Sequence, residues 1–147
     1  MAYPQLQAVR ERYQFCCGYC GVSEMEVGGE LTVDHFVPLS AGGTDGIENL
    51  VYSCVRCNQY KGALSPDAIQ RGNDRRLLYP LGDDLSIHLL EDEATGRLEG
   101  LTITGRFHIE AMRLNRPALI ANRQQRRLLA LLEARLDQAV AENTSLR

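Results

Sequence analysis

The sequence predicts an α+β fold in which a strand, a loop, a second strand and a helix are framed by two pairs of cysteines. Three observations lead to this prediction: two C-x-x-C pairs, β-branched segments on either side of a turn-rich loop, and a leucine stripe near the C-terminus. The chain has 147 residues, of which 44% are hydrophobic and 24% charged. These values fit one soluble globular domain, or a small core with an appended element, and exclude collagen-like and disordered chains.

Neither a secretory leader nor a membrane span is visible in the sequence. No stretch approaches the roughly 18 uninterrupted apolar residues that cross a bilayer. The N-terminal residues 1–15 reach charged side chains before any apolar run, whereas a signal peptide has an apolar centre. We therefore expect a cytoplasmic protein with no membrane partner.

Charge is distributed in blocks along the chain, whose formal net charge is −3. Residues 51–76 hold five basic and two acidic side chains, and residues 106–127 hold six arginines and one glutamate. The net charge argues against binding nucleic acid over the whole surface, but these two basic segments allow a local site. Arginines that merely cover apolar surface or face solvent would give the same pattern.

The cysteines predict a structural zinc site. Cys17 and Cys20 form one C-x-x-C pair, and Cys54 and Cys57 form another. Each pair can aim two sulfurs at one point, so that two pairs supply the four thiolates of a closed tetrahedral site. Disulfides would need an oxidising compartment, and a redox C-x-x-C pair does not normally come twice. Cys16 is either a spare thiol or a substitute for Cys17.

The segment between the cysteine pairs reads as two strands and a loop. Residues 30–37 are rich in β-branched and aromatic side chains and end at Pro38, and residues 47–53 form the returning strand. Glycines mark the loop between them, at residues 40–46. A short helix is expected to follow over residues 57–62 and to end at Gly62.

Three short motifs occur in order within this frame. They are Asp34-His35, Glu48-Asn49-Leu50 and Cys57-Asn58-x-x-Lys61-Gly62. In this order, between two cysteine pairs, they resemble the zinc-bearing branch of the HNH endonuclease family. The resemblance covers roughly residues 15–65 and implies a ββα-metal fold, also called a His-Me finger.

The resemblance also implies roles for individual residues. His35 would be the general base, and Asp34 and Asn58 would hold a catalytic divalent metal, Mg²⁺ or Mn²⁺. Asn49 would fix the loop and help to orient His35. Many relatives carry histidine where this chain has Asn58, which makes it an H-N-N variant. The chemistry agrees, because an imidazole with a pKa of about 6.5 can take a proton from water and oxygen ligands suit a hard cation.

Each of these residues also has a purely structural interpretation. A histidine in a strand can simply be hydrogen-bonded, and Asn49 or Asn58 can be a turn or cap residue. In a regular strand Asp34 would point away from His35, so the resemblance requires a local distortion there. Lys61 follows Asn58 by one helical turn, and we expect it, with Arg56, to contact substrate; a solvated lysine is the simpler interpretation.

Residues 67–147 are predicted to be an extension packed on the core of residues 1–66. Residues 87–90 and 98–103 are expected to pair as a β-hairpin, and a helix is expected from about residue 116 to 143. His88 and His108 have no ligand partner nearby and are interpreted as structural. The tail is similar to tails of small bacterial HNH proteins.

One face of the expected C-terminal helix carries an apolar stripe, formed by Leu128, Leu129, Leu132, Leu136 and Val140. The stripe would pack on the rest of the protein or form a homodimer interface.

These observations together predict a metal-dependent HNH endonuclease that hydrolyses phosphodiester bonds in DNA, or in RNA. No sequence-reading module is evident, so specificity would be low or supplied by a protein partner. Two alternatives stay open. One is a zinc-stabilised module that binds nucleic acid or protein without catalysis, and the other is a structural zinc protein with no role on nucleic acid.

Overall fold

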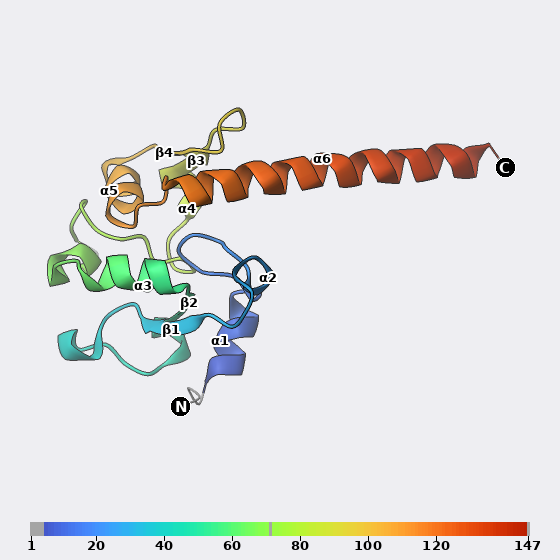
Figure 1. Cartoon of the computed structure of the whole chain (residues 1–147). Helices are drawn as coiled ribbons and strands as arrows, with labels where there is room; N and C mark the ends of the chain where they lie inside the picture. The colour runs from blue at the N-terminus through green and yellow to red at the C-terminus, as the bar shows by residue number, and fades with distance from the viewer. Residues whose placement is uncertain (1–4, 71, 147) are drawn as a thin grey trace.

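The computed structural model describes residues 5–70 and 72–146, and Figure 1 shows how its elements are arranged. In chain order they are α1 (Leu6–Arg12), α2 (Glu24–Val27), β1 (Thr32–His35), the 3-10 turns Leu39–Ala41 and Ile47–Asn49, β2 (Leu50–Ser53), α3 (Val55–Gly62), the 3-10 turn Pro66–Ile69, α4 (Leu85–His88), β3 (Leu89–Glu91), β4 (Leu98–Gly100), α5 (Ile103–Ala111) and α6 (Pro117–Ser145). The mixture of helices and two small antiparallel sheets confirms the α+β class. None of the described helices is both long and apolar enough to span a membrane.

Strands β1 and β2 lie at the centre of the N-terminal half. They pair antiparallel, from Thr32 opposite Ser53 to His35 opposite Leu50. All four residues of β2 are buried, because the neighbouring elements pack against both faces of this strand. The predicted order of strand, loop, strand and helix is present, and both strands are shorter than expected.

The segment before β2 differs from the prediction, which placed Asn49 inside the second strand. Residues 47–49 form a 3-10 turn, and Asn49 is the last residue of that turn. Its amide side chain bonds to the backbone of the loop, accepting from Val37 N and donating to the carbonyl oxygen of Thr44, each at 2.9 Å. Such side chain to backbone bonds compete with regular strand pairing, which explains the later start of β2.

Helix α3 begins earlier than the expected residue 57. Cys54 is its N-cap, with extended backbone angles, and the Cys54 Sγ accepts a hydrogen bond from Cys57 N at 3.4 Å. A cysteine is an uncommon cap, and its position follows from its pairing with Cys57 in the C-x-x-C motif. The second cysteine pair therefore lies on the first turn of α3, and the helix ends at Gly62 as predicted.

In the extension, the predicted hairpin is present as β3 and β4, but residues 103–111 form helix α5, which the sequence analysis missed. Thr102 caps this helix by accepting from Gly105 N at 2.9 Å. A Cβ atom on Gly105 would lie 2.1 Å from the His88 carbonyl oxygen. Glycine at this position therefore lets α5 lie directly against the end of α4.

Helix α6 starts at Pro117, as predicted, and only its first part packs on the rest of the protein. Leu119 and Arg123 are buried there, and the Arg123 guanidinium donates to the carbonyl oxygens of Gly96 and Leu114. Figure 1 shows the remainder of the helix projecting away from the other elements. The apolar stripe, which we expected to pack on the protein, is instead more than half exposed at every position.

His108 is a buried structural residue, as the sequence analysis expected. Its Nδ1 accepts a hydrogen bond from Leu78 N at 3.0 Å, which requires a neutral ring. Burial lowers the pKa of His108 to about 4. His88 is likewise engaged, with its Nδ1 2.6 Å from the Thr102 hydroxyl.

The His108 environment predicts a dependence of stability on pH. Between pH 6.5 and 4 the unfolded chain binds a proton at this residue that the folded chain does not, so the free energy of unfolding falls as pH falls. The loss should approach about 3 kcal/mol at pH 4. Urea unfolding should show that His108→Gln removes this part of the pH dependence, whereas His88→Gln keeps it. Equal pH dependence in wild type and His108→Gln would contradict the assignment.

Candidate zinc and nuclease sites

The four cysteines of the two C-x-x-C pairs come together in the structure. Their Sγ atoms all lie within 4.8 Å of one another, and those of Cys20 and Cys54 are 3.7 Å apart. Zn–S bonds of about 2.3 Å in a tetrahedron place sulfurs about 3.8 Å apart, so the cluster suits a zinc ion. None of the five cysteines forms a disulfide, and hydrogen bonding with Cys20 lowers the pKa of Cys17.

The first cysteine pair is held against β2 by a tight turn. Gly21 N donates to the Cys17 carbonyl oxygen at 2.8 Å, and Gly18 N donates to the carbonyl oxygen of Tyr52 at the same distance. A Cβ atom on Gly18 would lie 2.6 Å from the ring of Tyr13. Glycine therefore allows the turn to approach the strand closely enough to meet the second pair.

Cys16 lies outside the sulfur cluster. Its thiol is 3.4 Å from the Gln14 carbonyl oxygen, and partial burial raises its pKa. Of the two interpretations considered for this residue, a spare thiol fits its position.

Arg116 contacts the sulfur cluster, and the sequence analysis did not single it out for this role. Its Nη2 lies 3.6 Å from Cys57 Sγ and 3.9 Å from Cys54 Sγ. Its Nη1 donates to the Met112 carbonyl oxygen, and its guanidinium lies over the ring of Tyr60. Four thiolates around Zn²⁺ carry a net charge of −2, which a guanidinium in this position offsets. Only the three-dimensional structure reveals it, because Arg116 is 59 residues from Cys57.

Asp34 is held on the side of β1 that faces α3. Its Oδ2 accepts a hydrogen bond from the Tyr19 hydroxyl at 2.7 Å and lies 3.1 Å from Lys61 Nζ. Lys61 is only 7% exposed and also donates to the His35 carbonyl oxygen at 2.9 Å. Lys61, which we expected to contact substrate or solvent, thus bonds to residues of β1. Tyr19, which lies between the first two zinc-site cysteines, was not recognised from the sequence.

His35 lies at the end of β1 and is paired with a carboxylate from the loop. Its Nε2 is 2.8 Å from Asp45 Oδ1, and the two side chains are 20% and 69% exposed. Strand pairing is continuous through Asp34 and His35, so successive side chains point to opposite faces. From the sequence we treated Asp45 only as part of a turn. A carboxylate in the glycine-rich loop that follows the histidine is the signal that could have identified it as a partner of His35.

Asn49 braces the loop that carries Asp45. The amide makes a two-way contact with Val37, accepting from its N and donating to its carbonyl oxygen at 2.9 Å each, and it also donates to Thr44. A Cβ atom on Gly43 would lie 1.8 Å from the Val37 carbonyl oxygen, so the loop closes here only with glycine. The Asn49 amide thus bonds to the loop backbone at two places, and the help in orienting His35 that we expected of it stays a prediction.

The remaining predicted site residues lie on α3. Asn58 is exposed and stands one turn before Lys61 on this helix. Arg56 is also exposed, and its Nη1 lies 3.5 Å from the Gln59 side-chain oxygen. The convergence of Asn58 and Asp34 on one metal ion stays a prediction.

Residues 17–64 match the model of a family described as HNH endonuclease. The matched region contains both cysteine pairs, β1, β2 and α3, and it covers about a third of the chain. Residues 17–64 therefore match an HNH endonuclease domain, and the four cysteines within them fit the zinc-bearing branch, as the motifs predicted. No curated protein and no solved structure matches the chain.

The contact between Arg116 and the sulfurs predicts that this residue slows zinc release. Arg116→Gln should release zinc to a chromogenic chelator roughly 10-fold faster, because outer-shell partners typically contribute 10–100-fold to metal affinity. Arg113→Gln is the matched control, since Arg113 lies over the same Tyr60 ring, at 4.6 Å. Identical release from wild type and Arg116→Gln would contradict the proposed role of the guanidinium.

Proposed function

We propose that the protein is a metal-dependent HNH endonuclease that hydrolyses phosphodiester bonds, most readily in DNA. The observation that carries the proposal is the His35–Asp45 pair within the HNH domain, held at the end of β1 by the Asn49-braced loop. We place it in the cytoplasm of a bacterium, in keeping with the sequence analysis.

His35 would act as the general base that takes a proton from the attacking water. The Asp45 carboxylate, 2.8 Å from Nε2, can hold the imidazole in one orientation and stabilise it once it is protonated. Asp45 is therefore proposed as a positioning residue and His35 as the catalytic base.

A divalent metal, Mg²⁺ or Mn²⁺, would neutralise charge on the phosphate and on the leaving oxygen. The donor set agrees with a hard cation, because Asp34 offers a carboxylate oxygen and Asn58 an amide oxygen. Both described contacts of Asp34 involve Oδ2, and because Asp34 and His35 point to opposite faces of β1, a metal on the Oδ1 side would serve the His35 site only if the end of this strand shifts.

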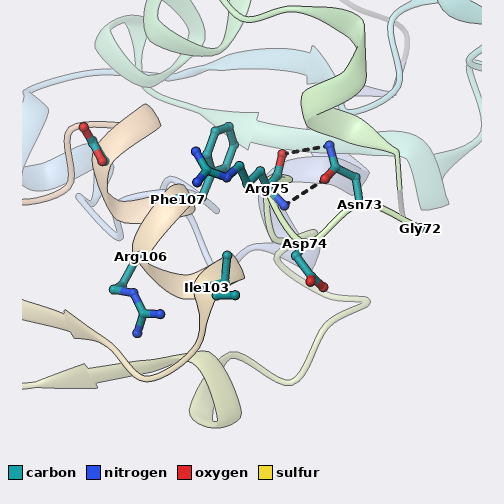
Figure 2. A pocket seen from close by; sticks show the side chains of 8 residues that line it. Gly72, Asn73, Asp74, Arg75, Ile103, Arg106 and Phe107 are labelled. Atoms are coloured by element: carbon teal, nitrogen blue, oxygen red, sulfur yellow. Dashed lines mark hydrogen bonds between the residues drawn. The ribbon is translucent and has the colours of Figure 1, made fainter.

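Contacts between the two basic segments support a nucleic-acid substrate. Arg113 of the second segment lies over Tyr60 of the first, at 4.6 Å. A cavity of about 680 Å³ between residues 72–75 and α5 also joins them, with Arg75 on one wall and Arg106 on the other. Figure 2 shows that the Arg75 side chain extends toward Phe107, whereas the Arg106 side chain points away from Phe107. The lining also holds Asp74 and Glu110, so the cavity itself carries balanced charge, and it is the arginines of the two adjoining segments that would steady a phosphate backbone.

A second candidate function is a zinc-stabilised binding module without catalysis. The observation in its favour is the ion pair between Lys61 and Asp34, together with the Tyr19 hydrogen bond. These contacts already neutralise the carboxylate that would serve as metal ligand. Binding of nucleic acid without cleavage is the expected result for this candidate.

Plasmid cleavage with Mg²⁺ or Mn²⁺ tests the proposal. The substitution His35→Ala should lower the cleavage rate roughly 100-fold or more, the usual contribution of a general base. His88→Ala serves as the matched histidine control and should cleave at close to the wild-type rate.

The substitution Asp45→Asn distinguishes a positioning role from a structural one. It should lower kcat less than His35→Ala does and leave KM close to the wild-type value, because a neutral amide holds the imidazole less firmly without altering substrate binding. Circular dichroism should show an unchanged fold. Cleavage by His35→Ala at the wild-type rate would contradict the assignment of His35 as the base, and an inactive wild type that still binds DNA would favour the binding module.

A further inference from the structure

The distal half of α6 exposes a continuous apolar surface. The side chains of Leu128, Leu129, Leu132, Leu136 and Val140 are between 51% and 65% exposed. Figure 1 shows this part of the helix projecting beyond every other element. Apolar stripes at helical spacing normally pack against a partner surface, and a projecting helix has little else to stabilise it in water.

Most of the stripe points away from the side of α6 that packs on the protein. Leu119 and Arg123 are the buried residues of the helix. Leu128 and Leu132 follow them by nine residues, about two and a half turns at 3.6 residues per turn, and so face the other way. The chain's own body therefore covers one face of α6 and leaves the leucine face for another molecule.

The spacing of these side chains fits a coiled-coil seam. Taking Leu129 and Leu136 as a positions places Leu132 and Ala139 at d, with Leu146 at the next d position. Asn143 falls at a, where a single asparagine specifies register and favours two strands at some cost in stability. In a parallel pair, each of these residues meets its own counterpart, so the seam is complementary to itself.

Surface area and charge also favour a second copy of this chain. Each of the five side chains leaves more than half of its surface exposed, and pairing two stripes would remove this apolar surface from water. Residues 128–147 carry two arginines and three acidic side chains, so two copies repel each other little and an anionic partner is not attracted.

We propose that the distal half of α6 forms a parallel two-stranded coiled coil with a second copy of this chain. The dimer would hold two HNH domains at one end. This interface is independent of the proposed nuclease chemistry.

Sedimentation velocity of the full zinc-loaded chain over a range of concentrations tests the proposal. Wild type should change from monomer to dimer as concentration rises. The double variant Leu132→Glu/Leu136→Glu should weaken association roughly 10-fold or more, since it places charges in the seam. The variant Asn143→Leu should form the same discrete dimer more tightly, a gain that loss of the helix cannot produce.

Leu131→Glu is the matched control, because Leu131 is 63% exposed on the same helix but lies on another face. It should associate as wild type does. A wild type that stays monomeric throughout would overturn the proposal, as would equal weakening by Leu131→Glu. Binding of a different protein by a monomeric chain would assign the stripe to that partner instead. Association is measured without substrate, so its failure leaves the nuclease proposal untouched.

Discussion

The structure depends on the meeting of four cysteine sulfurs that come from two distant segments. Cys17 and Cys20 lie in a turn after α1, and Cys54 and Cys57 lie on the first turn of α3. Linking them closes a loop that contains both strands, and a metal bound at such a site contributes directly to folding. With β1 and β2 alone, a two-stranded sheet would be marginally stable in water. The cluster thereby gives a small sheet a rigid frame.

Two sets of contacts connect the sulfur cluster to the rest of the protein, one through Arg116 and one through helix α3. On one side Arg116 joins the cluster to the start of α6, so that the extension is oriented by the same atoms that hold the core. On the other side α3 carries Lys61 to the carbonyl of His35 and to the carboxylate of Asp34. A single helix therefore relates the zinc site to the candidate catalytic strand, and a shift of α3 would disturb both.

The candidate nuclease site combines a rigid strand with a loop closed by side-chain bonds. The position of Asp45 next to His35 depends on Asn49 and on the absence of a side chain at Gly43. The ion pair at Asp34 shows the other property of the site, a partly buried carboxylate already paired with a cation. A metal at Asp34 would have to share the carboxylate with Lys61, which is why the two candidate functions differ at this residue.

The sequence by itself determined the two cysteine pairs, the order of strands and α3, the HNH motifs and the start of α6. These features rest on short spacings, which local geometry fixes. Tertiary structure alone decided the partners: Asp45 for His35, Tyr19 and Lys61 for Asp34, and Arg116 for the sulfurs. Each of these pairs joins residues at least ten positions apart, and no local pattern encodes such contacts. The same reason explains the leucine stripe. Its spacing predicted an apolar face on the helix, but the packing of Leu119 and Arg123 determined the direction in which that face points.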